Sequence, residues 1–113
     1  MLELITAVIK PYKVEEVKEA LLAAGVEGMT LTEVRGFGRQ RGKTENFRGS
    51  EYKIDFVPKV KIEVIVAADQ ADRIIELIVT AAKTDKIGDG KVWSIPFDRL
   101  VRVRTGEMGT DAV

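Results

Sequence analysis

Four stretches of the chain have the apolar, β-branched composition and the alternation that are typical of β-strands. They cover residues 2–9, 29–37, 60–66 and 92–95. In the first stretch, one face is formed by Leu2, Leu4, Thr6 and Val8. Pro11 ends this stretch, and Pro58 is expected to separate the third from an alternating segment at residues 52–57.

Two further stretches repeat their apolar residues at three- and four-residue steps, as amphipathic helices do. The second is the clearer helix, and Asp69 is expected to cap it. Gly25 is a suitable residue to end the first. The apolar side of the first helix is formed by Val14, Val17, Leu21 and Ala24, and that of the second by Ala71, Ile74, Ile75, Ile78 and Ala82.

The order of these elements is strand, helix, strand, long loop, strand, helix, strand, within one domain that spans residues 1–113. This order predicts an α+β, ferredoxin-like fold of two βαβ units, with an antiparallel four-stranded sheet and both helices on one face. The other face would expose Leu and Val side chains to water. We therefore expect a homo-oligomer in which these sheets pack together.

The connection between the second and third strands is unusually long. Residues 35–53, RGFGRQRGKTENFRGSEYK, carry six cations and two anions, and the loop itself spans about residues 38–57. Connections longer than about 12 to 15 residues are generally functional or disordered, so we interpret this one as a signalling loop. Ser50 and Tyr52 lie in its polar RGSEY stretch, where a modifying enzyme could reach them. Tyr52 can equally begin the next apolar segment and pack against it.

The last part of the chain is less regular. Residues 86–91, KIGDGK, read as a tight polar turn. Residues 100–104 alternate valine with arginine, which would place Arg102 and Arg104 on the same side of a strand. The final GEMGTDAV is polar and is expected to be mobile.

Composition narrows the possible functions. The chain has 113 residues, of which 45% are hydrophobic, and its 18 basic residues balance 18 acidic ones. That balance argues against a general nucleic-acid binder, which needs a basic domain. Without cysteine, disulfides and thiol chemistry are excluded. There is no run of about 18 apolar residues and no basic region of a signal peptide, so we expect a cytoplasmic protein.

Three polar clusters could meet at one anionic ligand. Two of them, Gly36-Phe37-Gly38-Arg39-Gln40 and Gly88-Asp89-Gly90-Lys91, combine cations with glycines that let backbone N–H groups approach an anion. The third is the pair Arg102 and Arg104. Charge-assisted hydrogen bonds contribute roughly 1.5 to 3 kcal/mol each, so three or four on one triphosphate would give micromolar binding or better.

Each cluster also has a simpler interpretation. GDGK alone is typical of an ordinary type I′ or II′ turn. Arg102 and Arg104 can form a solvated strand face, and the same holds for Lys59 and Lys61. Glu63 can be the polar partner in a strand alternation.

Two other functional classes fit the element order or the size. An RNA-binding module needs aromatic residues on its central strands for base stacking, and the third strand, VKIEVIVA, has none. A small hydrolase needs an acid/base or nucleophilic set, but the chain has no histidine or cysteine, and its only asparagine, Asn46, lies in the loop. We therefore assign no catalytic residues.

The segments IKPYK, GMTLTEVRGFGRQRG, TENFRGSEYKIDFVPKVKIEV, KIGDGKVW and VRVRTGE follow one another at the spacing of a known family. Over essentially the whole chain, the sequence resembles the PII nitrogen-regulatory signalling proteins. The resemblance implies a homotrimer of ferredoxin-like subunits, each with a long flexible loop. It implies ATP or ADP in the clefts between subunits, and 2-oxoglutarate bound with Mg-ATP beside the base of the loop.

The resemblance also implies site residues. Carried over by position, the nucleotide-binding residues are Thr30, Gly36, Gly38, Arg39, Glu63, Ile65, Gly88, Asp89, Gly90, Lys91, Arg102 and Arg104. The 2-oxoglutarate-binding residues are Phe37, Gly38, Gln40, Arg41, Gly42, Lys59 and Gly88. Gln40 would also coordinate the magnesium. A ligand that draws on both Gln40 and Lys59, at opposite ends of the loop, would rearrange it.

The implied role is that of an allosteric signal transducer for nitrogen metabolism and not of an enzyme. Its partners would be an ammonium channel or the enzymes that control glutamine synthetase, so contact with a membrane would come only through a channel partner. No nucleic acid is implied. Tyr52 matches the tyrosine that takes a uridylyl or adenylyl group in many bacteria, and Ser50 matches the serine phosphorylated in cyanobacterial members.

The chain departs from the family pattern at two loop positions. Lys43 replaces a common histidine, and Phe47 replaces a second loop tyrosine. Tyr52 is therefore the only phenol in the loop. Because Ser50 and Tyr52 are both present, the sequence leaves open which of them is modified.

Overall fold

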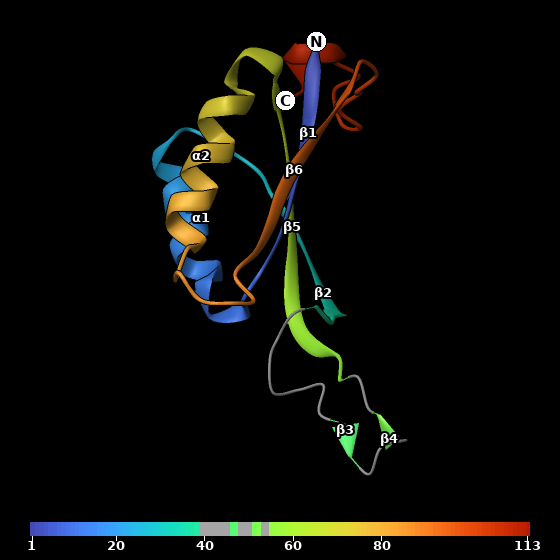
Figure 1. Ribbon diagram of the computed structural model, residues 1–113. Helices are drawn as coiled ribbons and strands as arrows, with labels where there is room; N and C mark the ends of the chain where they lie inside the picture. Colours follow the sequence, from blue (N-terminus) through green and yellow to red (C-terminus); the bar gives the residue numbers. More distant parts are fainter. Residues whose placement is uncertain (39–45, 48–50, 53–54) are drawn as a thin grey trace.

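The computed structural model describes residues 1–38, 46–47, 51–52 and 55–113 (Figure 1). Its main elements are β1 (Leu2–Ile9), α1 (Val14–Ala23), β2 (Thr30–Gly36), β5 (Val57–Ala67), α2 (Ala71–Ala82) and β6 (Gly90–Phe97). Within the long connection, a two-stranded ribbon is formed by β3 (Asn46–Phe47) and β4 (Glu51–Tyr52). The short 3-10 turns are η1 (Pro11–Lys13), η2 (Ala68–Gln70) and η3 (Gly109–Ala112).

The sheet confirms the ferredoxin-like expectation. Its four long strands are ordered β2-β5-β1-β6, and each neighbouring pair is antiparallel. Both helices cover the same face of this sheet (Figure 1). The two central strands, β1 and β5, pair along the whole of β1, from Leu2 opposite Ala67 to Ile9 opposite Val60. The two βαβ units are therefore interleaved, as this fold requires.

The hydrophobic core lies between the sheet and the helices. Because side chains alternate along a strand, Ile5, Ala7 and Ile9 of β1 point to the same face. The helices bring Val17, Leu21, Ile74 and Ile78 against this face, and none of the four is more than 1% exposed. The apolar stripes predicted for both helices are thus confirmed.

The two helices differ in how well their ends were predicted. Gly25 ends α1 as expected, because its φ of 93° lies in the left-handed region and its N–H donates to the carbonyl of Leu22 at 3.0 Å. The prediction for α2 was wrong, because Asp69 lies inside η2 and Gln70 is the N-cap residue, without a side-chain cap bond. A 3-10 turn leads into this helix instead. No helix in the described part of the chain combines the length and apolar character needed to cross a membrane.

Two prolines lie inside strands, so the predicted strand boundaries were too short. Pro58 is opposite Arg35 of β2, but β1 pairs with β5 only from Val60 onward. A residue with one strand neighbour needs hydrogen bonds on one side only. Pro96 lies in β6, an edge strand of the sheet. Proline is tolerated at both kinds of position, because its missing N–H is not needed there.

The C-terminal segment also differs from the prediction. Arg102 begins a turn, closed by a hydrogen bond from the N–H of Gly106 to its carbonyl at 2.8 Å. Arg102 and Arg104 therefore do not share a strand face. The tail, expected to be mobile, forms η3 and an isolated β-bridge between Val101 and Met108. The reversal is possible because Gly106 has a φ of 76°.

The sheet face away from the helices carries no helix of the described chain, and part of it is exposed (Figure 1). It carries apolar side chains from three strands: Leu4, Val8, Ile65, Trp93 and Ile95. Of these, Trp93 and Ile95 remain 43% and 53% exposed. Apolar area left in water forfeits roughly 25 cal/mol per Å² of stabilisation. The homo-oligomer stays a prediction, and these side chains are the surface that it would bury.

Two neighbouring residues of α2 test how the core holds the helix. Replacing the fully buried Ile78 by alanine is expected to lower the free energy of unfolding by about 2–5 kcal/mol, because it leaves a cavity. Replacing Val79, which is 46% exposed, is expected to change it by less than about 1 kcal/mol. Urea unfolding of both variants measures the difference, and equal losses would contradict this account of the core.

Candidate functional site

One cavity forms where β5 extends beyond its neighbour β2. The two strands pair only as far as Thr30 opposite Glu63, whereas β5 continues to Ala67. Beyond Glu63, β5 therefore has β1 on one side and, in the described chain, no strand on the other. A cavity of about 570 Å³ lies against this edge. Backbone N–H and C=O groups without a strand partner are available to a ligand.

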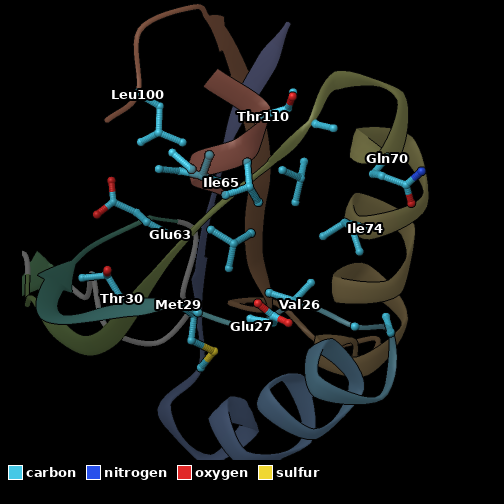
Figure 2. Close-up of a pocket in the computed structure, with 18 of the residues that line it drawn as sticks. Val26, Glu27, Met29, Thr30, Glu63, Ile65, Gln70, Ile74, Leu100 and Thr110 are labelled. Carbon is cyan, nitrogen blue, oxygen red and sulfur yellow. The ribbon is translucent and has the colours of Figure 1, made fainter. Parts of the chain in front are cut away.

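The walls of this cavity are mostly apolar (Figure 2). Thr30 and Glu63 lie on one side of it, and Gln70 at the end of η2 and Ile74 of α2 lie on the other (Figure 2). Further lining comes from the end of β5, from the connection between α1 and β2, and from C-terminal residues such as Leu100. A concave, apolar space with a few polar groups at its border suits a flat heterocycle such as a nucleobase.

A second cavity, of about 720 Å³, lies at the other end of β5. It brings together the glycine-rich end of β2 and the turn between α2 and β6, two of the clusters seen in the sequence. Beside it, Phe37 and Phe56 pack edge to face with ring centroids 5.3 Å apart, which joins the two ends of the long connection. The lining consists of Val8, Gly36, Phe37, Gly38, Lys59, Lys86, Ile87, Gly88, Asp89, Gly90, Lys91 and Trp93.

The turn at Gly88–Lys91 packs directly against the sheet. Gly88 and Gly90 have φ values of 96° and 104°, which favour glycine. A Cβ on Gly90 would lie 1.8 Å from the carbonyl oxygen of Val8, so only glycine allows this close approach. The Nζ of Lys59 donates to the carbonyl of Gly88 at 2.5 Å, which ties the turn to β5 as well. Three lysines of the lining, Lys59, Lys86 and Lys91, make the cavity suitable for phosphate or carboxylate groups.

The carboxylate of Asp89 is engaged by its own chain. The backbone N–H groups of Thr84 and Asp85 donate to Oδ2 at 2.7 and 2.9 Å, while the Thr84 hydroxyl donates to Oδ1. The Nζ of Lys10 lies 3.2 Å from Oδ1. Burial alone would raise the pKa of Asp89, but the donors on Thr84, Lys10 and Asp85 outweigh it and hold that pKa well below its usual range.

Lys59 is prepared to bind an anion. Burial, and then the positive charge of Lys10, lower the pKa of Lys59, while Asp89 acts in the opposite direction. A partly desolvated ammonium next to another cation gains more from an incoming anion than a hydrated lysine does, because the local dielectric is lower. A carboxylate or phosphate oxygen would therefore be a favourable partner for the Lys59 ammonium.

The third cluster lies far from the second cavity along the sheet. β6 runs from Gly90, opposite Ile9, to Phe97, opposite Leu2. Arg102 follows β6 and therefore lies beyond the Leu2 end of β1, on the side of the first cavity. Its Nη1 contacts the carboxylate of Glu107 at 3.0 Å, and its N–H donates to the carbonyl of Glu107 at 2.9 Å.

The predicted site residues thus fall into two groups. We call Thr30, Glu63 and Ile65, which line the first cavity, together with Arg102 and Arg104, which follow Leu100 and do not line it, the edge half-site. The turn half-site consists of Gly36, Phe37, Gly38, Lys59, Gly88, Asp89, Gly90 and Lys91. None of the residues that the structure describes lines both cavities. Arg39, Gln40, Arg41, Gly42 and Ser50 lie outside the described residues, and of Tyr52 only the backbone, in β4, is described.

Sequence reasoning missed Lys10 and Thr84. A threonine placed shortly before a glycine turn that carries an aspartate is a signal for side-chain capping of that turn. The Nζ of Lys10 donates to the Thr84 hydroxyl at 3.1 Å across 74 positions of sequence, and only the fold brings these residues together.

Comparison with known proteins decides the family. The family described as nitrogen regulatory protein P-II matches residues 2–107. The chain belongs to the P-II family. Nitrogen regulatory protein P-II of Cereibacter sphaeroides is 59% identical over 109 residues, which cover 96% of this chain and 97% of the relative. Nitrogen regulatory protein P-II of Synechocystis sp. is 52% identical with the same coverage.

A solved relative agrees in structure. Arabidopsis thaliana PII bound to citrate matches with a TM-score of 0.81 and 37% sequence identity, over 99% of this chain and 92% of that one. The expected P-II fold is therefore confirmed. P-II proteins are regulatory signal transducers and not enzymes, which excludes the hydrolase alternative. On the open face of this P-II protein, the described central strands β1 and β5 also lack the aromatic residues of an RNA-stacking platform.

The pKa of Asp89 predicts how its contribution to stability depends on pH. Because that pKa is lowered in the folded state, the carboxylate stabilises the fold fully above its ordinary pKa of about 3.9, and this is lost as the pH falls through the folded value. Asp89→Asn is therefore expected to lower the free energy of unfolding by about 1–3 kcal/mol at pH 7, and the gap from wild type should narrow below about pH 4.

Urea unfolding at pH 7 and near pH 3 measures this gap. Asp98→Asn, at an exposed position, removes the same charge and serves as the matched control. A gap for Asp89→Asn that stays constant with pH would contradict the assigned role of the carboxylate.

Proposed function

We propose that this P-II protein binds ATP or ADP at a site shared between two copies of the chain, and binds 2-oxoglutarate beside it. The observation that carries the proposal is the separation of the edge half-site from the turn half-site, at opposite ends of the sheet. Each half-site has chemistry that suits one part of a nucleotide, and neither has all of it.

The turn half-site would take the phosphates. Glycine backbone at Gly36, Gly38, Gly88 and Gly90 can turn N–H groups toward an anion, and Lys91 adds a point charge. Arg39 would contribute a further cation. The carboxylate of Asp89 is not available to pair with Lys91, because it already accepts hydrogen bonds from Thr84, Asp85 and Lys10. Phosphate contacts of this kind are worth roughly 1.5 to 3 kcal/mol each.

The edge half-site would take the adenine and complete the phosphate contacts. The unpaired edge of β5 at Ile65 offers backbone donor and acceptor groups in the plane where a base can lie. The Thr30 hydroxyl and the Glu63 carboxylate stand beside that edge and can read polar atoms of the base or ribose. Arg102 and Arg104 would reach the phosphates held by the neighbouring copy.

A homotrimer, as the family resemblance implies, would bring the two half-sites together. The apolar open face of the sheet, with Trp93 and Ile95 partly exposed, supports such an assembly, because packing the sheets removes this area from water. Each cleft between subunits would then combine the edge half-site of one copy with the turn half-site of the next. Assembly and nucleotide binding would consequently reinforce one another.

The effector 2-oxoglutarate would bind at Lys59, with Phe37, Gly38, Arg41, Gly42 and Gly88 around it. The desolvated ammonium of Lys59 supports this assignment, because it suits a carboxylate. Arabidopsis PII, solved bound to citrate, is a family member that accepts a polycarboxylate.

Magnesium fits this site as a companion of the nucleotide. Within the described residues no group of three or more acidic, histidine or cysteine side chains could hold a metal ion. Mg²⁺ commonly takes few protein ligands and is held by phosphates. The family resemblance implies the Gln40 amide as its protein ligand. When bound, the ion would offset the negative charge of the phosphates and of the dicarboxylate.

The output would be the position of the long loop, which begins beside Gly38 and returns at Lys59. A ligand that uses residues at both ends of the loop changes which loop conformations are favoured. The targets would be an ammonium channel or enzymes that control glutamine synthetase, in the cytoplasm. Modification at Tyr52 or Ser50 would change the charge of the same surface.

Replacing Lys59 separates the two ligands. Lys59→Ala is expected to spare ATP affinity within about threefold and to weaken 2-oxoglutarate binding by about tenfold or more, because one charge-assisted contact is lost. Calorimetry with ATP first and 2-oxoglutarate second, in magnesium, measures both. Lys61→Ala removes the same charge on the same face of β5 outside the cavity lining and should behave as wild type. Unchanged 2-oxoglutarate affinity in Lys59→Ala would refute the assignment.

Mixing two defective variants tests whether the site is shared. Lys91→Ala disables the turn half-site, and Arg102→Ala with Arg104→Ala disables the edge half-site, so each protein alone should bind ADP at least about tenfold more weakly. After the two are unfolded together and refolded, random assembly should restore about one cleft in four. Each variant refolded alone is the control. If calorimetry finds no regained sites, the half-sites do not meet between copies.

A further inference from the structure

We propose that Lys10 and Thr84 are positioning residues for the turn at Gly88–Lys91. They act through Asp89, whose carboxylate holds the segment before the turn by hydrogen bonds and would accept none from the ligand. This inference rests on the proposed phosphate-binding role of the turn and adds two residues to it. It also changes the expected role of Asp89. The family resemblance implies a nucleotide contact for Asp89, whereas here it positions the residues that make such contacts.

The acceptor capacity of Asp89 is used up. A carboxylate offers about four acceptor positions on its two oxygens. The N–H groups of Thr84 and Asp85 occupy Oδ2, at 2.7 and 2.9 Å. The Thr84 hydroxyl and the Lys10 ammonium occupy Oδ1. A bound phosphate would be repelled by this carboxylate, whose acceptor positions are already filled by groups of its own chain.

Thr84 is saturated in the same way. A threonine hydroxyl has one donor and two acceptor positions. It donates to Asp89, and it accepts from the Nζ of Lys10 at 3.1 Å and from the N–H of Lys86 at 3.2 Å. The acceptor positions of Thr84 and Asp89 are therefore filled, and Lys10 directs two of its three N–H donors into the network. Polar networks of this kind fix one geometry, because any shift leaves a partly buried group without a partner.

The backbone around the network includes one residue in an uncommon conformation. Asp85 adopts a φ of 67°, which is uncommon for a residue other than glycine, and its N–H is one of the donors to Asp89. Lys10 directly follows β1, so the network ties the turn to the end of one central strand, while Lys59 ties Gly88 to the other. The phosphate-binding residues are thereby placed before any ligand arrives, which lowers the entropy cost of binding.

Removing either partner is expected to loosen the turn. In Lys10→Met and Thr84→Val, the affinity for ADP measured by calorimetry should fall by about tenfold, as expected for one charge-assisted contact made less well. The affinity for adenosine, which has no phosphate, should stay within about twofold of wild type. Thr84→Ser keeps the hydroxyl and should restore ADP binding. Lys13→Met is the matched control. It removes the same charge three residues away, from a lysine that pairs with Glu16 at 2.8 Å.

A second measurement needs no nucleotide. Amide exchange by NMR should show faster exchange at Thr84, Asp85 and Gly90 in Lys10→Met and Thr84→Val than in Lys13→Met. Equal ADP affinity, or unchanged amide exchange, in folded Lys10→Met and Thr84→Val would overturn the inference, as would parallel losses for ADP and adenosine. Failure of the wild-type protein to bind ADP would instead remove the proposed function, while the amide exchange would still decide whether the network positions the turn.

Discussion

The antiparallel pairing of β1 with β5 is the constraint on which both half-sites depend. Eight residue pairs fix the register of the two strands, and their opposite ends carry different chemistry. At one end, Lys10 and Lys59 meet the turn that follows α2. At the other end, β5 extends past its shorter neighbour and leaves an edge free beside the C-terminal turn. A shift of register by one residue would turn every core side chain to the open face and separate the lysines from the turn.

In the proposed shared site, assembly would be part of the binding chemistry. A chain that carried the whole site within itself could bind a nucleotide as a monomer, with no consequence for its neighbours. Here the arginines near Leu100 and the lysines near Gly88 lie toward opposite ends of the sheet, so in the proposed site the copies of the chain would have to share a ligand. Sharing would give each ligand influence over the relation between subunits, which is a prerequisite for cooperative sensing.

Local patterns in the sequence were sufficient for the fold, but only partly for the site. The period-two and three-to-four-residue repeats gave the strands and helices, because those patterns report which face is buried. The strand ends predicted at Pro58 and Pro96 were wrong. A proline is tolerated wherever one side of a strand has no neighbour, and the order of strands in the sheet decides where that is. Arg102 was assigned to a strand because alternation over a few residues does not reveal the turn at Gly106. The network of Lys10 and Asp89 joins segments that are distant in sequence, so no local pattern could signal it.

The aromatic contact between Phe37 and Phe56 has a consequence for how such proteins diversify. Together with the pairing of Gly36 and Val57, it closes the two ends of the long connection at the margin of the sheet. Changes in the length or composition of the middle of that connection are therefore expected to leave the core undisturbed. Substitutions in the middle of this connection are therefore expected to leave the pairing of the four long strands unchanged.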